Sequence, residues 1–267
     1  MQIDSATTAL VTGGSRGIGL ATGRALAARG VRVGLLARSR DGLEEAVASL
    51  RPSPAGDHLK LLADIGRGRE VERAVERFVR QAGRLDLIVA NAGIAHYGPF
   101  VGSDVEDAEE MVRVNVLGTI YTVRAALGPM LERRHGHVVV LSSGAGLRAF
   151  PGAAVYGGTK AFGRGFAEAL RHELAGTGVG LTTVFPGEIA TDLHAHERDL
   201  LPDWRKNEEE LPPEPLAEAI VDAVAADRRR VFVPRVVGLL GINGVAPRLT
   251  DVLLAKIRGR SAAPRLD

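Results

Sequence analysis

The sequence contains no cysteine among its 267 residues. Disulfide bonds, thiolate metal sites and cysteine nucleophiles are therefore excluded, and the composition suits a reducing compartment. No segment reaches the roughly 18 uninterrupted apolar residues that a membrane-spanning helix needs. The formal net charge is only +2, and no long basic block is present. Nothing in the charge pattern indicates binding to nucleic acid.

A signal-peptide pattern is also missing. Met1-Gln-Ile-Asp4 has neither a basic n-region nor an apolar h-region, and the first expected strand begins within about ten residues of Met1. Cleavage of a signal peptide would remove part of that strand and the turn after it. We therefore expect a cytoplasmic protein.

The remaining composition is that of an ordinary globular protein, with 45% hydrophobic and 25% charged residues. The length fits one large α/β domain better than two small ones. Short apolar runs alternate with segments of helical periodicity, and the runs expected to form strands are 8–11, 31–37, 58–63, 85–90, 137–141, 179–185 and 231–233. This alternation predicts a single α/β domain with a Rossmann-type, doubly wound parallel sheet of about seven strands. Ligands of such sheets bind beyond the carboxyl ends of the strands.

A glycine-rich turn lies between the first expected strand and the first expected helix, in Leu10-Val-Thr-Gly-Gly-Ser-Arg-Gly-Ile-Gly19. Gly13, Gly17 and Gly19 have the spacing T-G-x-x-x-G-x-G, which differs from the commoner G-x-G-x-x-G of dinucleotide sites. Glycine permits close backbone approach, and the start of the helix offers unpaired N–H groups to a phosphate. The alternative is a tight turn that binds nothing.

Two arginines bear on the choice of cofactor. Arg38 directly follows the second expected strand, where NAD-binding folds usually carry an acidic residue for the adenosine ribose. Arg16 lies within the glycine turn, and the next carboxylate is Asp41. The two cations and the missing acid favour NADP(H) over NAD(H), unless both arginines are merely solvated surface residues.

Five further residues could carry chemistry. Ser142 and Ser143 end the fifth expected strand, although serine there is also compatible with an ordinary turn. Tyr156 and Lys160 are four residues apart, which places them on one face of a helix, where the ammonium would lower the pKa of the phenol. Asn115 lies within a long helix that we expect to begin with a capping box at Ser103 and to end near Arg134. A buried asparagine side chain at this position would need hydrogen-bond partners within the protein, whereas a solvated one would not.

Two C-terminal segments have unusual composition. The polar stretch at about 189–213 lies at the ligand end of the sheet and suggests a substrate lid. Its two histidines, His194 and His196, lack carboxylate or cysteine companions at a fitting spacing, so we expect no metal site. The apolar segment 236–267 is interpreted as an extension that packs on the same domain or on a partner subunit.

Taken together, the motifs resemble the short-chain dehydrogenase/reductase family in its basic single-domain form. The matching elements occur in the family's order and with its separations: Thr12-Gly-Gly-Ser-Arg-Gly-Ile-Gly19, Asp64, Asn91-Ala-Gly93, Asn115, Ser143, Tyr156-Gly-Gly-Thr-Lys160 and Pro186-Gly-Glu-Ile-Ala-Thr191. The likeness covers roughly residues 6 to 235. Gly157-Gly158-Thr159 departs from the more usual Ala-Ser before the lysine.

The resemblance implies a role for each matched residue. The catalytic residues would be Asn115, Ser143, Tyr156 and Lys160, with Tyr156 as proton donor in carbonyl reduction and Ser143 as hydrogen-bond donor to the substrate oxygen. Lys160 would hold the nicotinamide ribose, and Asn115 would anchor a water that relays protons. The cofactor, NADP(H), would be bound by Gly13, Ser15, Arg16, Gly17, Ile18, Gly19, Arg38, Asp64, Ile65, Asn91, Ala92, Gly93, Tyr156, Lys160, Pro186, Gly187, Ile189 and Thr191.

We therefore predict an NADP(H)-dependent oxidoreductase that interconverts a ketone or aldehyde and an alcohol, acting as a homodimer or homotetramer. The alternatives are a catalytically silent nucleotide-sensing regulator on the same fold and a non-redox lyase or epimerase. A regulator would be expected to lose Tyr156 or Lys160, and a lyase usually needs a larger substrate domain. Tyr97, Leu147 and Phe150 suggest an apolar small-molecule substrate, whereas His96, Arg148 and His194 could read a polar group.

Overall fold

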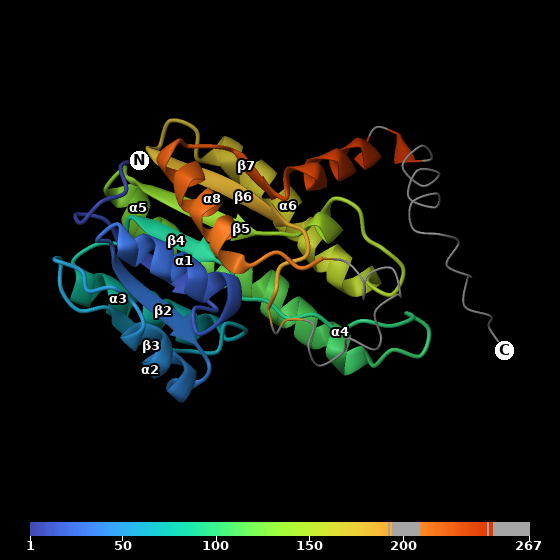
Figure 1. Ribbon diagram of the computed structural model, residues 1–267, viewed down its shortest axis with the longest axis horizontal. Coiled ribbons are helices and arrows are strands. Elements are labelled where there is room, and N and C mark those ends of the chain that lie inside the picture. Colours follow the sequence, from blue (N-terminus) through green and yellow to red (C-terminus); the bar gives the residue numbers. More distant parts are fainter. Residues whose placement is uncertain (192, 194–208, 245, 248–267) are drawn as a thin grey trace.

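The computed structural model describes residues 1–191, 193, 209–244 and 246–247. These residues form a single α/β domain with a seven-stranded, fully parallel sheet in the order β3-β2-β1-β4-β5-β6-β7 (Figure 1). The strands are β1 Thr8–Thr12, β2 Arg32–Ala37, β3 Leu59–Leu62, β4 Leu87–Ala90, β5 Gly136–Leu141, β6 Val179–Pro186 and β7 Arg230–Val233. All seven expected strands are confirmed, and so is the Rossmann-type doubly wound sheet.

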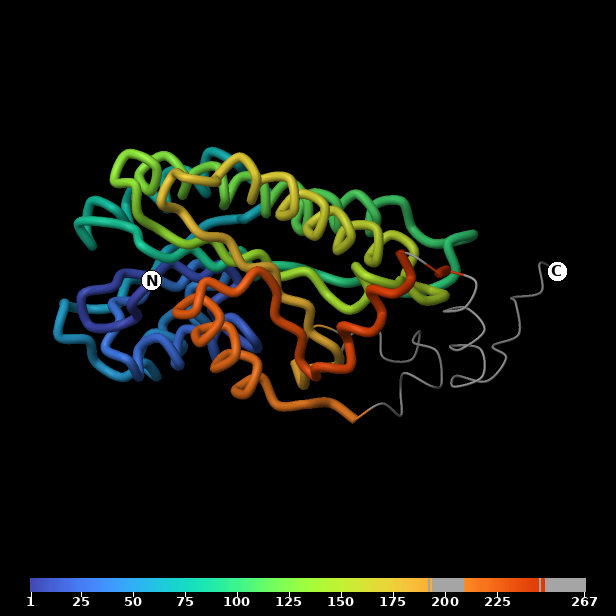
Figure 2. The backbone as a smooth tube through the Cα atoms, turned by 90° about the horizontal axis from the view of Figure 1, so that it is seen from above, coloured from blue at the N-terminus to red at the C-terminus, as the bar shows by residue number. Residues whose placement is uncertain are grey.

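Helices cover both faces of the sheet, as Figure 2 shows with α5 and α6 on one side and α1 and α8 on the other. The helices are α1 Gly17–Ala28, α2 Arg40–Ala48, α3 Gly68–Ala82, α4 Val105–Met111, α5 Gly118–Glu132, α6 Ala154–Glu173 and α8 Pro213–Ala225. Two apolar cores result, one under α1 and α8 and the other under α3, α5 and α6. Strands buried on both faces explain why the strand runs are apolar throughout rather than alternating.

The long helix expected from Ser103 to about Arg134 is confirmed as a continuous helical run from Val105 to Glu132, which comprises three consecutive segments. Helix α4 is capped by Asp104, whose side chain accepts a hydrogen bond from Glu106 N, and not by Ser103. The hydroxyl of Ser103 donates to Phe100 O instead. A π-helical segment, η1 at Val112–Leu117, follows α4 and precedes α5. Single π-turns within helices often occur at functional sites, and this one contains Asn115.

The chain contains two 3₁₀ segments among the described residues. The first, η2 at Gly144–Gly146, directly follows Ser143. The second, η4 at Arg235–Gly244, packs against β6, β7 and η2 at the end of the sheet (Figure 1). In η4, Val237 and Leu240 pack against Leu147, Phe185 and Phe232 of the same domain.

Much of the stretch expected to form a lid, residues 192 and 194–208, lies outside the described residues, and so do 245 and 248–267 of the extension. Among the residues that the structure describes, no helix has the length and apolar character to cross a membrane.

Candidate active site

The glycine turn and the carboxyl ends of the central strands surround one cavity of about 490 Å³. Seventeen of the eighteen residues predicted to bind the cofactor line it, together with Ser143. The lining also includes Ser142. It further includes residues that the sequence interpretation did not single out: Leu36, Ala37, Ser39, Gly42, Ala63, Ile94, Val114, Leu141 and Leu193. Most of these residues are apolar, and composition gives no signal that separates them from core residues.

Gly19 does not line the cavity but makes the turn possible. A Cβ atom on Gly19 would overlap the Gly13 carbonyl oxygen and lie 2.6 Å from Asn91 Nδ2. Gly13 itself has φ of +65°, which favours glycine. The two glycines therefore allow the chain to fold tightly into the start of α1, whose first turn carries no acidic residue. Such a helix start suits an anionic diphosphate.

Asn91 fixes this turn to the neighbouring strand. Its side chain donates to Thr12 O at 2.9 Å, and its backbone N–H donates to Thr12 Oγ1 at 3.1 Å. The Thr12 hydroxyl in turn donates to Val89 O. Asn91 thus joins the ends of β1 and β4, which are neighbours in the sheet.

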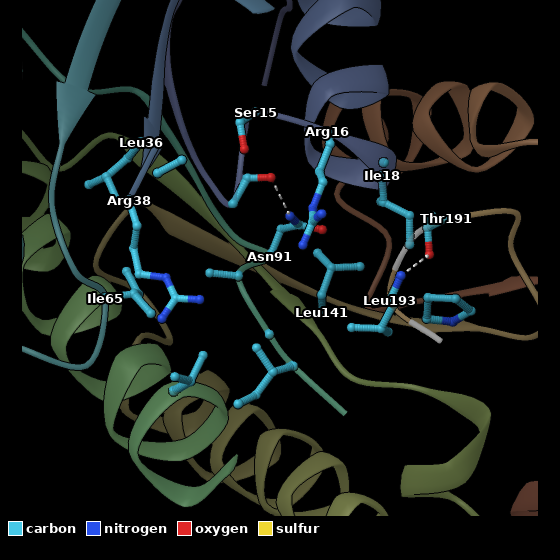
Figure 3. A pocket seen from close by; sticks show the side chains of 18 of the residues that line it. Ser15, Arg16, Ile18, Leu36, Arg38, Ile65, Asn91, Leu141, Thr191 and Leu193 are labelled. Carbon is cyan, nitrogen blue, oxygen red and sulfur yellow. Dashed lines mark hydrogen bonds between the residues drawn. The ribbon is translucent and has the colours of Figure 1, made fainter. Parts of the chain in front are cut away.

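Arg16 and Arg38 enter the cavity from two different elements, the glycine turn and the end of β2 (Figure 3). The Arg38 side chain is 61% exposed, and its Nη1 lies 3.6 Å from Glu110 Oε1. Asp64, after β3, pairs with Arg113 at 3.2 Å and accepts a hydrogen bond from Gly66 N. One end of the cavity is therefore rich in charges of both signs.

At the other end, Tyr156 and Lys160 lie one turn apart at the start of α6, and both side chains are buried. Lys160 Nζ is 5.8 Å from the centre of the Tyr156 ring. Burial lowers the pKa of Lys160 to about 8. Lys160 therefore remains mostly protonated at pH 7, although its pKa lies close to that pH.

Asn115 is buried behind this pair and does not line the cavity. Its side-chain oxygen accepts from Ile94 N, and its amide donates to Ile94 O, each at 2.9 Å. The amide also donates to Thr159 Oγ1 at 3.0 Å. Asn115 is thus a fully buried asparagine with partners, and the solvated alternative is wrong.

The two serines at the end of β5 have different surroundings. Ser142 is buried, and its hydroxyl donates to Lys160 O at 2.7 Å. Ser143 faces the cavity, and its hydroxyl oxygen accepts from Ala145 N at 3.1 Å, so its proton is available to a ligand. The geometry favours Ser143 over Ser142 as the residue that contacts a substrate.

Two further aromatic side chains lie near Tyr156. The ring of Tyr97 packs edge-on to Tyr156 at 5.6 Å and stacks on Phe150 at 6.0 Å. Neither Tyr97 nor Phe150 is among the described residues that line the cavity, and the same is true of Leu147, His96 and Arg148. His194 lies outside the described residues. No group of three or more metal-ligating side chains occurs in the described part of the chain.

Gly157 marks where the sequence departs from the usual pattern. A Cβ atom at this position would lie 2.5 Å from Ala149 Cβ, so α6 approaches the preceding loop closely. The second glycine, Gly158, has no atom within 4 Å of such a Cβ. Only the first of the two glycines is required by packing.

Comparison with known proteins agrees with this geometry. Residues 7–201 match the sequence model described as short chain dehydrogenase. The chain is 36% identical over 183 residues to a 3-oxoacyl-[acyl-carrier-protein] reductase of Bos taurus, which covers 68% of this chain and 76% of that protein. It is also 35% identical over 227 residues to the glycine betaine reductase ATRR of Emericella nidulans, covering 82% of this chain but only 18% of that protein.

Two solved structures share the fold. A short-chain dehydrogenase/reductase of Burkholderia phymatum in complex with NAD aligns over 94% of this chain and 96% of its own, with a TM-score of 0.82 and 24% identity. An alcohol dehydrogenase of the archaeon Thermococcus sibiricus, complexed with 5-hydroxy-NADP, aligns over 85% and 94%, with a TM-score of 0.74 and 28% identity. The chain therefore belongs to the short-chain dehydrogenase/reductase family of oxidoreductases, whose members bind a nicotinamide cofactor.

Proposed function

We propose that this protein is an NADP(H)-dependent oxidoreductase that interconverts a ketone or aldehyde and the corresponding alcohol. The observation that carries the proposal is the single cavity that joins the glycine turn, with Arg16 and Arg38, to Ser143, Tyr156 and Lys160. A nicotinamide dinucleotide has both an anionic diphosphate and a reacting ring, and the cavity has complementary groups at its two ends.

The residues fit the cofactor on chemical grounds. The close approach at Gly13 and Gly19 leaves room and free N–H groups for the diphosphate. Arg16 and Arg38 offer guanidinium groups for a 2′-phosphate, and no carboxylate follows β2 directly to hydrogen-bond a ribose 2′-hydroxyl. The bound cofactor would supply or accept the hydride.

Residues of the chain itself would transfer the proton and stabilise the negative charge that develops on the substrate oxygen. Tyr156 donates its phenolic proton to the carbonyl oxygen during reduction and accepts it back during oxidation. Ser143 donates a hydrogen bond to the same oxygen as negative charge develops there. Lys160 places a cation one helical turn away, which favours the phenolate that remains after transfer.

We propose an apolar or aromatic carbonyl compound as the substrate, because Tyr97 packs against Tyr156 and Phe150 stacks on Tyr97. We also propose a homodimer or homotetramer. Val236, Leu239 and Ile242 of η4 are exposed apolar residues that support an apolar contact at this end of the domain.

The first experiment is a titration of NADPH and NADH into the wild type and Arg38→Ala, followed by a screen of ketones for NADPH oxidation. We expect NADPH to bind more tightly, and the variant to lose that preference. The Tyr156→Phe variant should bind NADPH but lose at least about a hundredfold in turnover, as is typical for loss of a general acid. Equal affinity of the wild type for both cofactors, or activity of Tyr156→Phe within a few-fold of wild type, would refute the respective part of the proposal.

A further inference from the structure

Glu110 lies in the last turn of α4, and its carboxylate is shared among three basic side chains. Oε1 is 3.6 Å from Arg38 Nη1 and 3.5 Å from Arg113 Nη2. Oε2 is 3.8 Å from His96 Nε2. The Glu110 side chain is 34% exposed, whereas Arg38 is 61% exposed. Glu110 is therefore the more sheltered member of its pair with Arg38.

Arg113 is held more firmly than Arg38. Its Nη1 pairs with Asp64 Oδ2 at 3.2 Å, and it packs over Gly66, where a Cβ atom would come within 2.5 Å of the guanidinium. Asp64 and Glu110 thus enclose Arg113 from two sides. Within the described part of the chain, the carboxylate in contact with Arg38 is that of Glu110. This carboxylate therefore bears most directly on the orientation of the Arg38 guanidinium.

The same arginine is the group that would receive the 2′-phosphate of NADPH. A phosphate monoester carries nearly two negative charges at neutral pH. A carboxylate within ion-pair distance of the receiving guanidinium competes with the phosphate for Arg38 and repels it directly. NADH has no such phosphate, so the same carboxylate affects NADH binding much less.

We propose that Glu110 is a specificity-determining residue: it holds Arg38 as a counter-charge and selectively weakens the binding of NADPH. The inference rests on the proposed use of Arg38 for the 2′-phosphate and deepens it. Glu110 limits how strongly the two arginines prefer NADPH, and it does so from a helix that no dinucleotide-binding motif includes.

The test compares dissociation constants for NADPH and NADH in wild type, Glu110→Gln, Arg38→Ala and the double variant at low ionic strength. Glu110→Gln removes the charge and keeps the shape of the side chain. We expect NADPH affinity to rise roughly three- to tenfold, as for loss of one nearby like charge that is partly screened by solvent. The NADH affinity should change less than about twofold, and added salt should shrink the gain.

Asp107→Asn is the matched control, because Asp107 is on the same helix and pairs with His96 at 3.7 Å. The substitution removes one negative charge from α4 at a position whose ion pair is with His96 and not with Arg38. We expect it to alter the affinity for either cofactor by less than about twofold. Comparable thermal unfolding midpoints for all variants would show that they are folded.

The outcomes separate the two proposals. If Arg38→Ala weakens NADPH binding but Glu110→Gln leaves it unchanged, the role of Glu110 is refuted and the cofactor assignment stands. If Glu110→Gln improves both cofactors equally, the role in specificity is likewise refuted. If Arg38→Ala leaves NADPH binding unchanged, both proposals fail. In the double variant, the gain from Glu110→Gln should disappear, as expected for two residues that act through one contact.

Discussion

The side-chain amide of Asn115 donates a hydrogen bond to Thr159 Oγ1 at 3.0 Å, and that hydroxyl donates to Tyr156 O at 2.8 Å. The π-turn after α4 is thereby joined to the first turn of α6. Because Asn115 also holds Ile94 through two hydrogen bonds, three separate segments meet at one buried amide. The position of Tyr156 depends on this junction.

Replacing Thr159 tests the junction. Thr159→Val keeps the volume but leaves the Asn115 amide without this acceptor in a buried site. We expect the free energy of unfolding to fall by about 1–3 kcal/mol, the usual cost of an unsatisfied buried group. Urea denaturation measures the change. Thr159→Ser retains the hydroxyl and should stay within about 1 kcal/mol of wild type; an equal loss in both variants would point to methyl packing instead.

The buried ammonium of Lys160 should lower the free energy of unfolding. Its pKa is lowered from 10.5 to about 8 by burial, so the folded chain binds this proton less tightly than the unfolded chain. Between about pH 8 and 10.5 the unfolded state carries more of this proton, and stability therefore rises with pH across that window. Below it, the buried charge costs up to about 3 kcal/mol.

Lys160→Met should therefore unfold at higher urea concentration than wild type at pH 7, while losing turnover. Lys60→Met is the control, because Lys60 is 51% exposed and pairs with Glu44 on the surface. It should change the free energy of unfolding by less than about 1 kcal/mol. A Lys160→Met variant less stable than wild type would show that the ammonium is stabilised by its surroundings after all.

His137 should control stability in acid. Burial lowers its pKa to about 4, and its Nε2 lies 2.8 Å from Thr182 Oγ1. The unfolded histidine takes up a proton near pH 6.5, but the folded one does so only near pH 4. The contribution of neutral His137 to the free energy of unfolding is therefore fully present above about pH 6.5. It falls by about 3 kcal/mol as the pH drops to 4.

We expect His137→Gln to lose less stability than wild type between pH 6.5 and 4, as measured by urea denaturation at each pH. The exposed His172 provides the comparison, and His172→Gln should reproduce the wild-type slope. Parallel curves for wild type and His137→Gln would contradict the assigned cause.

The glycine turn offers a matched pair of substitutions. Gly19→Ala forces a methyl group against the Gly13 carbonyl, so we expect a loss of about 1–3 kcal/mol in stability and weakened binding of NADPH. Gly165→Ala, on an exposed face of α6 with no atom within 4 Å, should gain up to about 1 kcal/mol and bind NADPH as wild type does. Calorimetry and cofactor titration distinguish the two, and normal cofactor binding by Gly19→Ala would disprove the steric argument.

Much of the fold could be predicted because each strand is an apolar run buried on both faces. The expected run 179–185 differs from β6 by one residue, and 85–90 begins two residues before β4. The π-turn at Val112–Leu117 could not be predicted, since it accompanies hydrogen bonds between Asn115 and the distant Ile94 that no local pattern indicates. The ion pair between Arg38 and Glu110 could not be predicted from the sequence either. It joins a strand end to a helix 72 positions further along the chain, and no local sequence pattern indicates such a contact.

Tyr156 and Lys160 lie on one continuous helix, whereas Leu147 and η4 come from elements outside it. The pitch of α6 fixes the spacing of Tyr156 and Lys160, the pair to which we assign the proton transfer. None of the described residues of η4 lines the cavity that contains Tyr156 and Lys160, so a change of sequence within η4 should leave the spacing of this pair intact.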